Sequence, residues 1–157
     1  MKGWLSLSWL VLVLLPLTAA LQAQNQGEVG FLAGGVKMFL DEPIEPYIGG
    51  QALVSVSRRL MVGPDIYFIR GARFERVNLV GRLEYTPQDA GRVRGYLVAA
   101  GGFYRELDKP INYVHYEESF GGGAGLKVRF GRLLLVPEAM LRIGEFPRLS
   151  FGARYAF

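Results

Sequence analysis

The sequence predicts an all-β fold in which eight antiparallel strands follow one another, up and down, around a closed barrel. Three observations support this prediction. From residue 29 onward the pattern of apolar and polar residues has a period of two, which is the period of a β-strand. Turn-like breaks divide this part of the chain into eight segments of about ten residues. In most segments one phase of the alternation is apolar, whereas the other carries the charges.

The N-terminal residues have the composition of a secretory signal peptide. The basic Lys2 precedes an apolar run over Trp4–Leu17, and small and polar residues follow. This order of charged, apolar and small-residue regions is typical of a cleaved export signal. A membrane anchor is the alternative, but the apolar run is shorter than the roughly 20 residues that a helix needs to span a bilayer. Ala20 and Ala23 are candidate cleavage positions, and we expect cleavage after Ala23, which makes residues 1–23 the signal peptide.

Residues 24–157 then form the mature chain, a single β-barrel domain. Its length suits eight strands of about ten residues with their connections, and is too short for a large porin of sixteen strands. The predicted strands cover residues 29–39, 46–57, 60–70, 75–86, 92–105, 119–130, 133–143 and 148–157.

The two phases of strands three to eight differ sharply in polarity. One phase holds no residue that is charged at neutral pH, and examples from successive strands are Leu60, Phe68, Leu79, Tyr85, Leu97, Phe103, Phe120, Phe130, Leu135, Leu141, Phe151 and Phe157. The opposite phase holds Asp65, Arg76, Asn78, Arg82, Glu84, Arg94, Lys127, Arg129, Glu138, Arg142, Ser150 and Arg154. The first strand has no clean phase, because Lys37 falls with Val29 and Phe31.

Strand length and aromatic placement favour a transmembrane barrel over a soluble one. Strands of about ten residues match a tilted membrane strand, whereas five or six residues are usual in soluble sheets. Apolar-phase aromatics gather near the strand ends, as two interfacial girdles require. The girdles are Phe68, Phe103 and Phe120 at one end, and Tyr85, Phe130, Tyr155 and Phe157 at the other. Short connections also alternate with longer ones, the longest of which spans residues 106–118.

The last eight residues resemble the C-terminal assembly signal of bacterial outer-membrane proteins. Ser150, Gly152, Tyr155 and Phe157 fill its pattern of a polar residue, a glycine and two aromatics. Together with the signal peptide and the eight strands, the mature chain resembles the small OmpA/OmpX-type barrels. This resemblance implies a porin-like, integral outer-membrane protein of a Gram-negative cell envelope. It also implies contact with outer-membrane lipid and with the assembly machinery, through the C-terminal strand.

Composition excludes several other functions. The chain has no cysteine and a single histidine, so a metal centre built on those residues is not expected, and no cofactor is implied. The formal net charge is only +4, and its basic residues are scattered rather than clustered, so we expect no nucleic-acid binding.

The sequence offers three candidate chemical sites, and the motif support for each is weak. The glycine-rich run 121–125 lacks the Lys-Ser/Thr of a phosphate loop, and we interpret it as space for Tyr96 and Tyr104. His115 lies near Glu117, Glu118 and Ser119 in the predicted 106–118 loop region, which suggests acyl-transfer chemistry. A solvated loop is the simpler interpretation. The acids Glu106, Asp108, Glu117 and Glu118 lack EF-hand spacing, so we assign no catalytic, cofactor or metal residues.

The charged phase predicts a plugged lumen. Counting back from the connections places Glu84 opposite Arg94 and brings Glu138 close to Arg154. Three acids against seven bases leave an excess of bases, which we expect at the mouths of the lumen, with Arg76 and Arg129 as examples. Two prolines inside strands, Pro64 and Pro137, each delete a ladder donor and suggest bulges.

We therefore expect a monomeric, non-enzymatic protein with a structural or surface-interaction role. A lipid-modifying outer-membrane enzyme, such as an acyl hydrolase or transferase, is one alternative. A secreted soluble barrel that binds an apolar ligand is the other, and it requires the apolar phase to face inward.

Overall fold

The computed structural model describes residues 26–37, 43–88, 90–143 and 147–157 of the chain. They form eight strands: β1 (Gly27–Val36), β2 (Glu45–Ser55), β3 (Leu60–Arg70), β4 (Phe74–Tyr85), β5 (Val93–Asp108), β6 (Tyr113–Phe130), β7 (Leu133–Arg142) and β8 (Arg148–Ala156). The predicted signal peptide, residues 1–23, and its cleavage site lie outside the described residues. Within the described ranges, no helix is long and apolar enough to cross a membrane.

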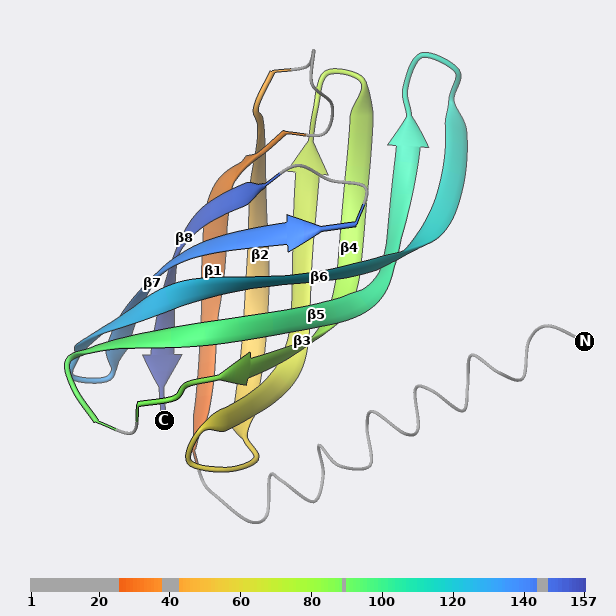
Figure 1. Cartoon of the computed structure of the whole chain (residues 1–157). Coiled ribbons are helices and arrows are strands. Elements are labelled where there is room, and N and C mark those ends of the chain that lie inside the picture. Colours follow the sequence, from red (N-terminus) through yellow and green to blue (C-terminus); the bar gives the residue numbers. More distant parts are fainter. Residues whose placement is uncertain (1–25, 38–42, 89, 144–146) are drawn as a thin grey trace, which may run out of the picture.

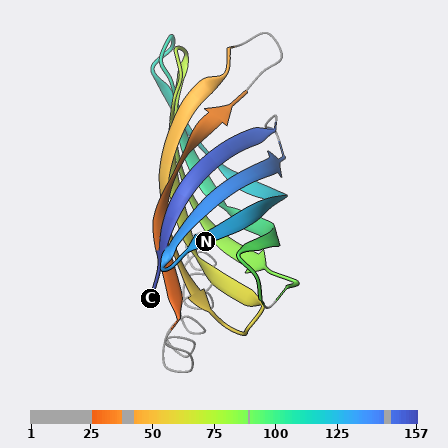
Figure 2. The same ribbon diagram turned by 90° about the vertical axis from the view of Figure 1, so that its left-hand side faces the viewer.

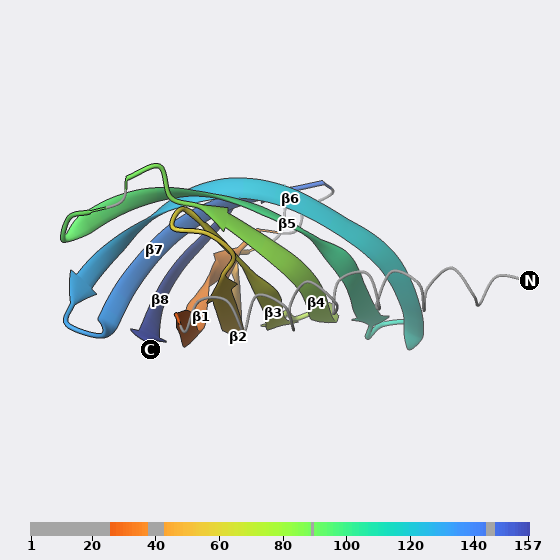
Figure 3. The ribbon, with the colours of Figure 1, turned by 90° about the horizontal axis from the view of Figure 1, so that it is seen from below.

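The strands form a closed barrel, as the sequence predicts. Each strand pairs antiparallel with its neighbour in sequence, and β1 pairs with β8 to close the sheet (Figure 1). Gly27 and Phe157 continue the β1–β8 ladder with reciprocal backbone hydrogen bonds of 3.0 and 2.9 Å. Figure 2 shows how the strands tilt as they run round the barrel. Seen from below, β5 and β6 arch over the side away from β8, β1 and β2 (Figure 3).

The two ends of the barrel differ. The start of β1 and the C-terminus lie at one end, here called the terminal end, with the β2–β3, β4–β5 and β6–β7 connections (Figure 1). The β6–β7 connection is only Gly131 and Arg132, and Gly131 takes the left-handed φ of 65° that such a tight turn requires. The β3–β4 and β5–β6 hairpins project at the opposite end, here called the hairpin end.

The predicted 106–118 loop is wrong, because most of it is strand. β5 continues to Asp108 and β6 begins at Tyr113, so that residues 109–112 alone connect them. Asn112, at φ 50°, helps to close this turn. The alternation of polar residues here continues the ladder, and backbone pairing satisfies groups that a loop would leave to water. Connection lengths therefore differ less between the two ends than the sequence suggested.

The two prolines do not create bulges. Pro64 pairs with Gly81 on β4, and the β2–β3 register is the same on both sides of the gap opposite the proline. Pro137 likewise pairs with Phe151 on β8, and the β6–β7 register is the same on both sides of the gap opposite it. Each proline removes its own backbone N–H donor, but no extra residue enters either strand.

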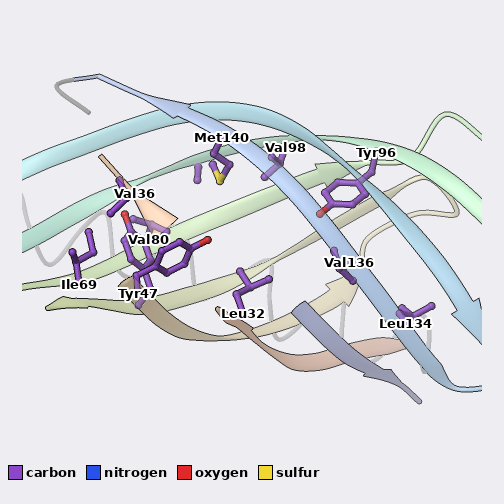
Figure 4. Packing of buried hydrophobic residues seen from close by; sticks show 12 residues of the cluster. Leu32, Val36, Tyr47, Ile69, Val80, Tyr96, Val98, Leu134, Val136 and Met140 are labelled. Atoms are coloured by element: carbon purple, nitrogen blue, oxygen red, sulfur yellow. The ribbon is translucent and has the colours of Figure 1, made fainter. Parts of the chain in front are cut away.

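The predicted apolar phase lies on the outer face of the barrel, and the predicted charged phase lies inside. Large apolar side chains cover the outer face, including Phe31, Phe68, Leu79, Phe103, Leu141 and Phe151, which are 51–63 % exposed. β1 also has a clean phase, because the strand ends at Val36 and excludes Lys37. The inner face holds a cluster of buried apolar residues from β1, β2, β3, β4, β5 and β7 (Figure 4). Charged side chains lie among them.

Candidate functional site: the barrel interior

The interior contains a balanced set of buried charges. Six acidic and six basic side chains of the described residues are at most 6 % exposed. They are Glu28, Glu45, Asp65, Glu84, Glu106 and Glu138, with Arg76, Arg82, Lys127, Arg142, Arg148 and Arg154. A buried charge is stable only when it is paired and hydrogen-bonded, so their arrangement decides what the interior can do.

Glu84 on β4 is the centre of the charged cluster. Its carboxylate accepts two hydrogen bonds from the Arg154 guanidinium of β8, at 2.7 and 2.9 Å. The Lys127 ammonium of β6 lies 2.8 Å from Glu84 Oε2, and Arg82 Nη2 lies 2.6 Å from Oε1. One carboxylate with no solvent exposure therefore joins three cations from three strands.

Glu28 and Glu138 extend this cluster across the barrel. Glu28 on β1 accepts hydrogen bonds of 3.0 Å from both Lys127 and Arg154. Glu138 on β7 accepts hydrogen bonds from both Nη atoms of Arg82 and one of 2.7 Å from the Tyr96 hydroxyl of β5. The contacts thus connect side chains of β1, β4, β5, β6, β7 and β8, which surround the lumen.

Arginines packed on tyrosine rings lie beside this cluster. Arg148 lies 4.8 Å from the Tyr47 ring centroid and 4.4 Å from that of Tyr67, and Arg142 lies 4.9 Å from Tyr67. Arg142 also donates a 2.6 Å hydrogen bond to the Ser119 hydroxyl. Such cation–π contacts stabilise a desolvated guanidinium and fill space as well.

A second, smaller cluster lies in the β4–β6 wall toward the hairpin end. Arg76 donates to Glu106 at 2.6 Å and lies 4.0 Å from the Tyr104 ring centroid. His115 Nε2 is 3.4 Å from Glu106 Oε1, and the Tyr104 hydroxyl donates to Glu117. These contacts join the extended parts of β5 and β6 to β4.

Ten of the twelve polar-phase residues predicted from the sequence are buried, but the predicted pairs are wrong. Glu84 faces Val98 in the ladder, and Arg94 is half-buried opposite Lys127. Glu138 faces Ser150, while Arg154 contacts Glu84 instead. Counting from the turns assumes strands that start level, whereas closing a barrel staggers neighbouring strands.

The predicted excess of bases is also wrong. Arg129 is exposed near the terminal end, as expected, but Arg76 is buried and paired with Glu106. Sequence reasoning missed Glu28, Glu45, Glu106 and Arg148 as interior charges. Glu28 and Glu45 lie just before the predicted strands began, and Glu106 just after one ended. Arg148 shares its phase with Ser150 and Arg154, and that signal was available.

The glycine-rich run provides space, as predicted for one of the two tyrosines. Gly125 faces Tyr96, and a Cβ at Gly125 would lie 2.4 Å from the Tyr96 hydroxyl oxygen. Tyr104 instead faces Glu117. Gly121 and Gly123 leave room for β7, because a Cβ at either would meet β7 backbone within 2.6 Å.

Of the candidate acyl-transfer residues, His115 and Glu117 lie within 4.0 Å of each other, but the serine is not brought to them. Ser119 is buried and bonded to Arg142, and it lies four residues from His115 on one strand, which is a separation of ~13 Å. Within the described part of the chain, no group of three or more His, Cys, Asp or Glu side chains is arranged to hold a metal ion.

Comparison with known proteins bears on the fold. No protein-family model matches the sequence, and no curated protein matches it. Solved structures do match. The N-terminal β-barrel domain of Pseudomonas aeruginosa OprF superposes with a TM-score of 0.72 at 13% identity, over 85% of this chain and 98% of that one. The chain has the fold of the small outer-membrane β-barrels.

Two further structures agree with this assignment. Neisserial surface protein A superposes with a TM-score of 0.64 at 14% identity, over 84% of this chain and 96% of that chain. A major outer membrane protein from Thermus thermophilus does so with a TM-score of 0.52 at 14% identity, over 84% and 99%. At these identities the likeness concerns the fold.

Proposed function

We propose that the chain is an integral outer-membrane protein whose lumen is plugged by its own side chains, with a structural or surface-interaction role. The observation that carries this proposal is the joint polarity of the barrel: an apolar outer face around a buried charged interior. Lipid can cover the apolar outer face without unfavourable contacts. The buried charges of the interior are stable only when they pair with one another. The matched solved structures support the location, since their names describe surface and outer-membrane proteins.

The contacts of Glu84 are the basis for the plug. Arg154 and Lys127 come from other strands around the lumen, and both contact the Glu84 carboxylate at 2.7–2.9 Å, where these side chains are at most 2 % exposed. Eight strands enclose an interior that side chains just fill. An ion would have to break several buried charge contacts at once to pass.

The β5–β6 hairpin supports a surface-interaction role. It projects at the hairpin end (Figure 1). Ile111 in its turn and Tyr113 and Tyr116 at the start of β6 are 59–71 % exposed. Exposed aromatic and aliphatic side chains are common in protein-binding surfaces. With an even number of strands, termini in the periplasm place this hairpin outside the cell.

Planar-bilayer recording tests the plug. The refolded mature protein should show no steady single-channel current, because the charged cluster closes the lumen. Steady unitary currents from the unmodified protein would contradict the plug but leave the membrane location intact. Fractionation tests the location separately, and recovery in the soluble periplasmic fraction would contradict it and favour the soluble barrel.

An envelope role also requires partners. We propose that the protein is a monomer in outer-membrane lipid and that β8, together with Phe157 directly after it, contacts the assembly machinery. The aromatic at position 157 is 60 % exposed, so its ring is accessible for such recognition.

A further inference from the structure

The outer face carries a groove across β1, β2 and β3. It has a volume of about 580 Å³, and its walls include Phe31, Ala33, Ile48, Ile66 and Phe68, with Gly50 in its floor. Phe31, Gly50 and Ile66 lie in one hydrogen-bonded row, and Ala33, Ile48 and Phe68 in the next. Glycine opens the groove because the floor lacks a side chain between two large neighbours.

Two basic residues flank the groove toward the hairpin end. Arg70 is the last residue of β3, on the same outward column as Ile66 and Phe68 and ~7 Å beyond Phe68. Lys37 follows directly after β1, ~13 Å beyond Ala33. The Arg70 side chain is 86% exposed, and its contact with Glu75 at 3.7 Å is exposed as well, so it remains accessible to an external anion.

We propose that this groove binds an anionic, phosphate-bearing lipid, with an acyl chain over Gly50 and the phosphate between Lys37 and Arg70. The apolar walls suit a hydrocarbon chain, which needs no hydrogen bonds. Lys37 directly follows β1 and Arg70 ends β3, so one strand lies between them. With an offset of ~7 Å along the strands, their backbones are roughly 12 Å apart, and their long side chains can both reach one headgroup. The inference rests on the proposed membrane location.

A lipid occupant fits better than a second copy of the chain. A two-fold contact requires a patch that complements itself. Here two copies would bring Lys37 and Arg70 of each chain into one apolar contact, with like charges close together. An anionic amphiphile instead complements both the groove and the bases.

Tryptophan fluorescence provides the test. The only tryptophans, Trp4 and Trp9, lie in the predicted signal peptide, so Phe31→Trp in the mature chain is a single reporter on the groove wall. Phe120→Trp on β6 is the control, since its side chain is 51% exposed on the outer face. Both are refolded into phosphatidylcholine vesicles containing a minor fraction of phosphatidic acid with brominated acyl chains, which quench tryptophan on contact.

We expect the apparent association constant of the brominated lipid, measured by quenching, to be about fivefold higher at position 31 than at position 120. Two exposed ionic contacts with the phosphate account for a preference of this size. Lys37→Gln with Arg70→Gln in the Phe31→Trp background should abolish that preference. Equal quenching at both positions, or a preference that survives loss of both bases, would overturn the proposal.

Filling the groove provides a second test. A Cβ at Gly50 meets no heavy atom nearer than 3.8 Å, so Gly50→Val should fold and displace the acyl chain. Gly81→Val, on the outer face of β4 with a nearest contact of 3.7 Å, is the matched control. Quenching at position 31 should fall in Gly50→Val alone. Unchanged quenching in Gly50→Val would overturn the proposal. It would also be overturned if every lipid quenched position 31 weakly and the protein could be cross-linked as a dimer, because a second copy would then cover the groove.

The two proposals fail in distinguishable ways. If the protein inserts into the vesicles without lipid preference, the groove inference fails and the membrane location stands. If it does not insert at all, the proposed function fails first.

Discussion

Glu84 is the residue whose loss should cost the barrel the most stability. It has no solvent exposure and contacts Arg154, Lys127 and Arg82 at 2.6–2.9 Å. Glu84→Gln keeps the shape but removes the charge, leaving six buried bases against five acids. Glu28 would then be the sole remaining carboxylate partner of Arg154 and Lys127 among the contacts described above.

Breaking a buried charge pair by removing one partner costs roughly 3–5 kcal/mol. We expect Glu84→Gln to lower the free energy of unfolding by about 3 kcal/mol, because the glutamine oxygen still accepts a hydrogen bond. Urea unfolding in detergent micelles, followed by far-UV circular dichroism, measures this change. Residues 24–157 contain no tryptophan, which makes circular dichroism the practical signal.

Glu75→Gln is the matched control for this experiment. The Glu75 side chain is 44% exposed and pairs with Lys109 at 3.1 Å, so its loss should change stability by less than about 0.5 kcal/mol. A difference of less than about 1 kcal/mol between the two variants would refute the central position of Glu84 in the interior.

Two other substitutions test the assembly signal and the packing. Phe157→Ala should lower the yield in the membrane but leave refolding into detergent nearly intact. The reason is that the hydrogen bonds between Phe157 and Gly27 join backbone atoms and do not need the ring. Equal losses in both assays would contradict this. Gly125→Ala should cost about 1–3 kcal/mol through the clash with Tyr96, whereas Gly81→Ala should be nearly neutral, and equal unfolding midpoints would refute the packing argument.

The architecture could be predicted from the sequence because every strand of such a barrel alternates apolar outward-facing residues with polar inward-facing ones. Period-two alternation predicted the strand count and the face of residues such as Leu79 and Arg82. The charge sorting was informative since an unpaired charge on a lipid-facing position is costly. The same rule failed for β1 only because Lys37 was included in the strand.

The contacts inside the barrel could not be predicted in the same way. Partners such as Glu84 and Arg154 are 70 residues apart and meet across the lumen, so no ladder register connects them. Their meeting depends on strand stagger, which the sequence near a turn does not reveal. The extended β5–β6 hairpin was missed because its polar and aromatic residues resemble those of a loop.

Location together with topology is the most direct test of the account. A protease site introduced into the turn at residues 109–112 would be probed in intact cells expressing the full chain, followed by membrane fractionation. We expect the protein to stay in the outer-membrane fraction after high-salt washing and to be cut in the turn by external protease. Recovery as a soluble periplasmic protein, or cleavage only after the outer membrane is permeabilised, would contradict this expectation.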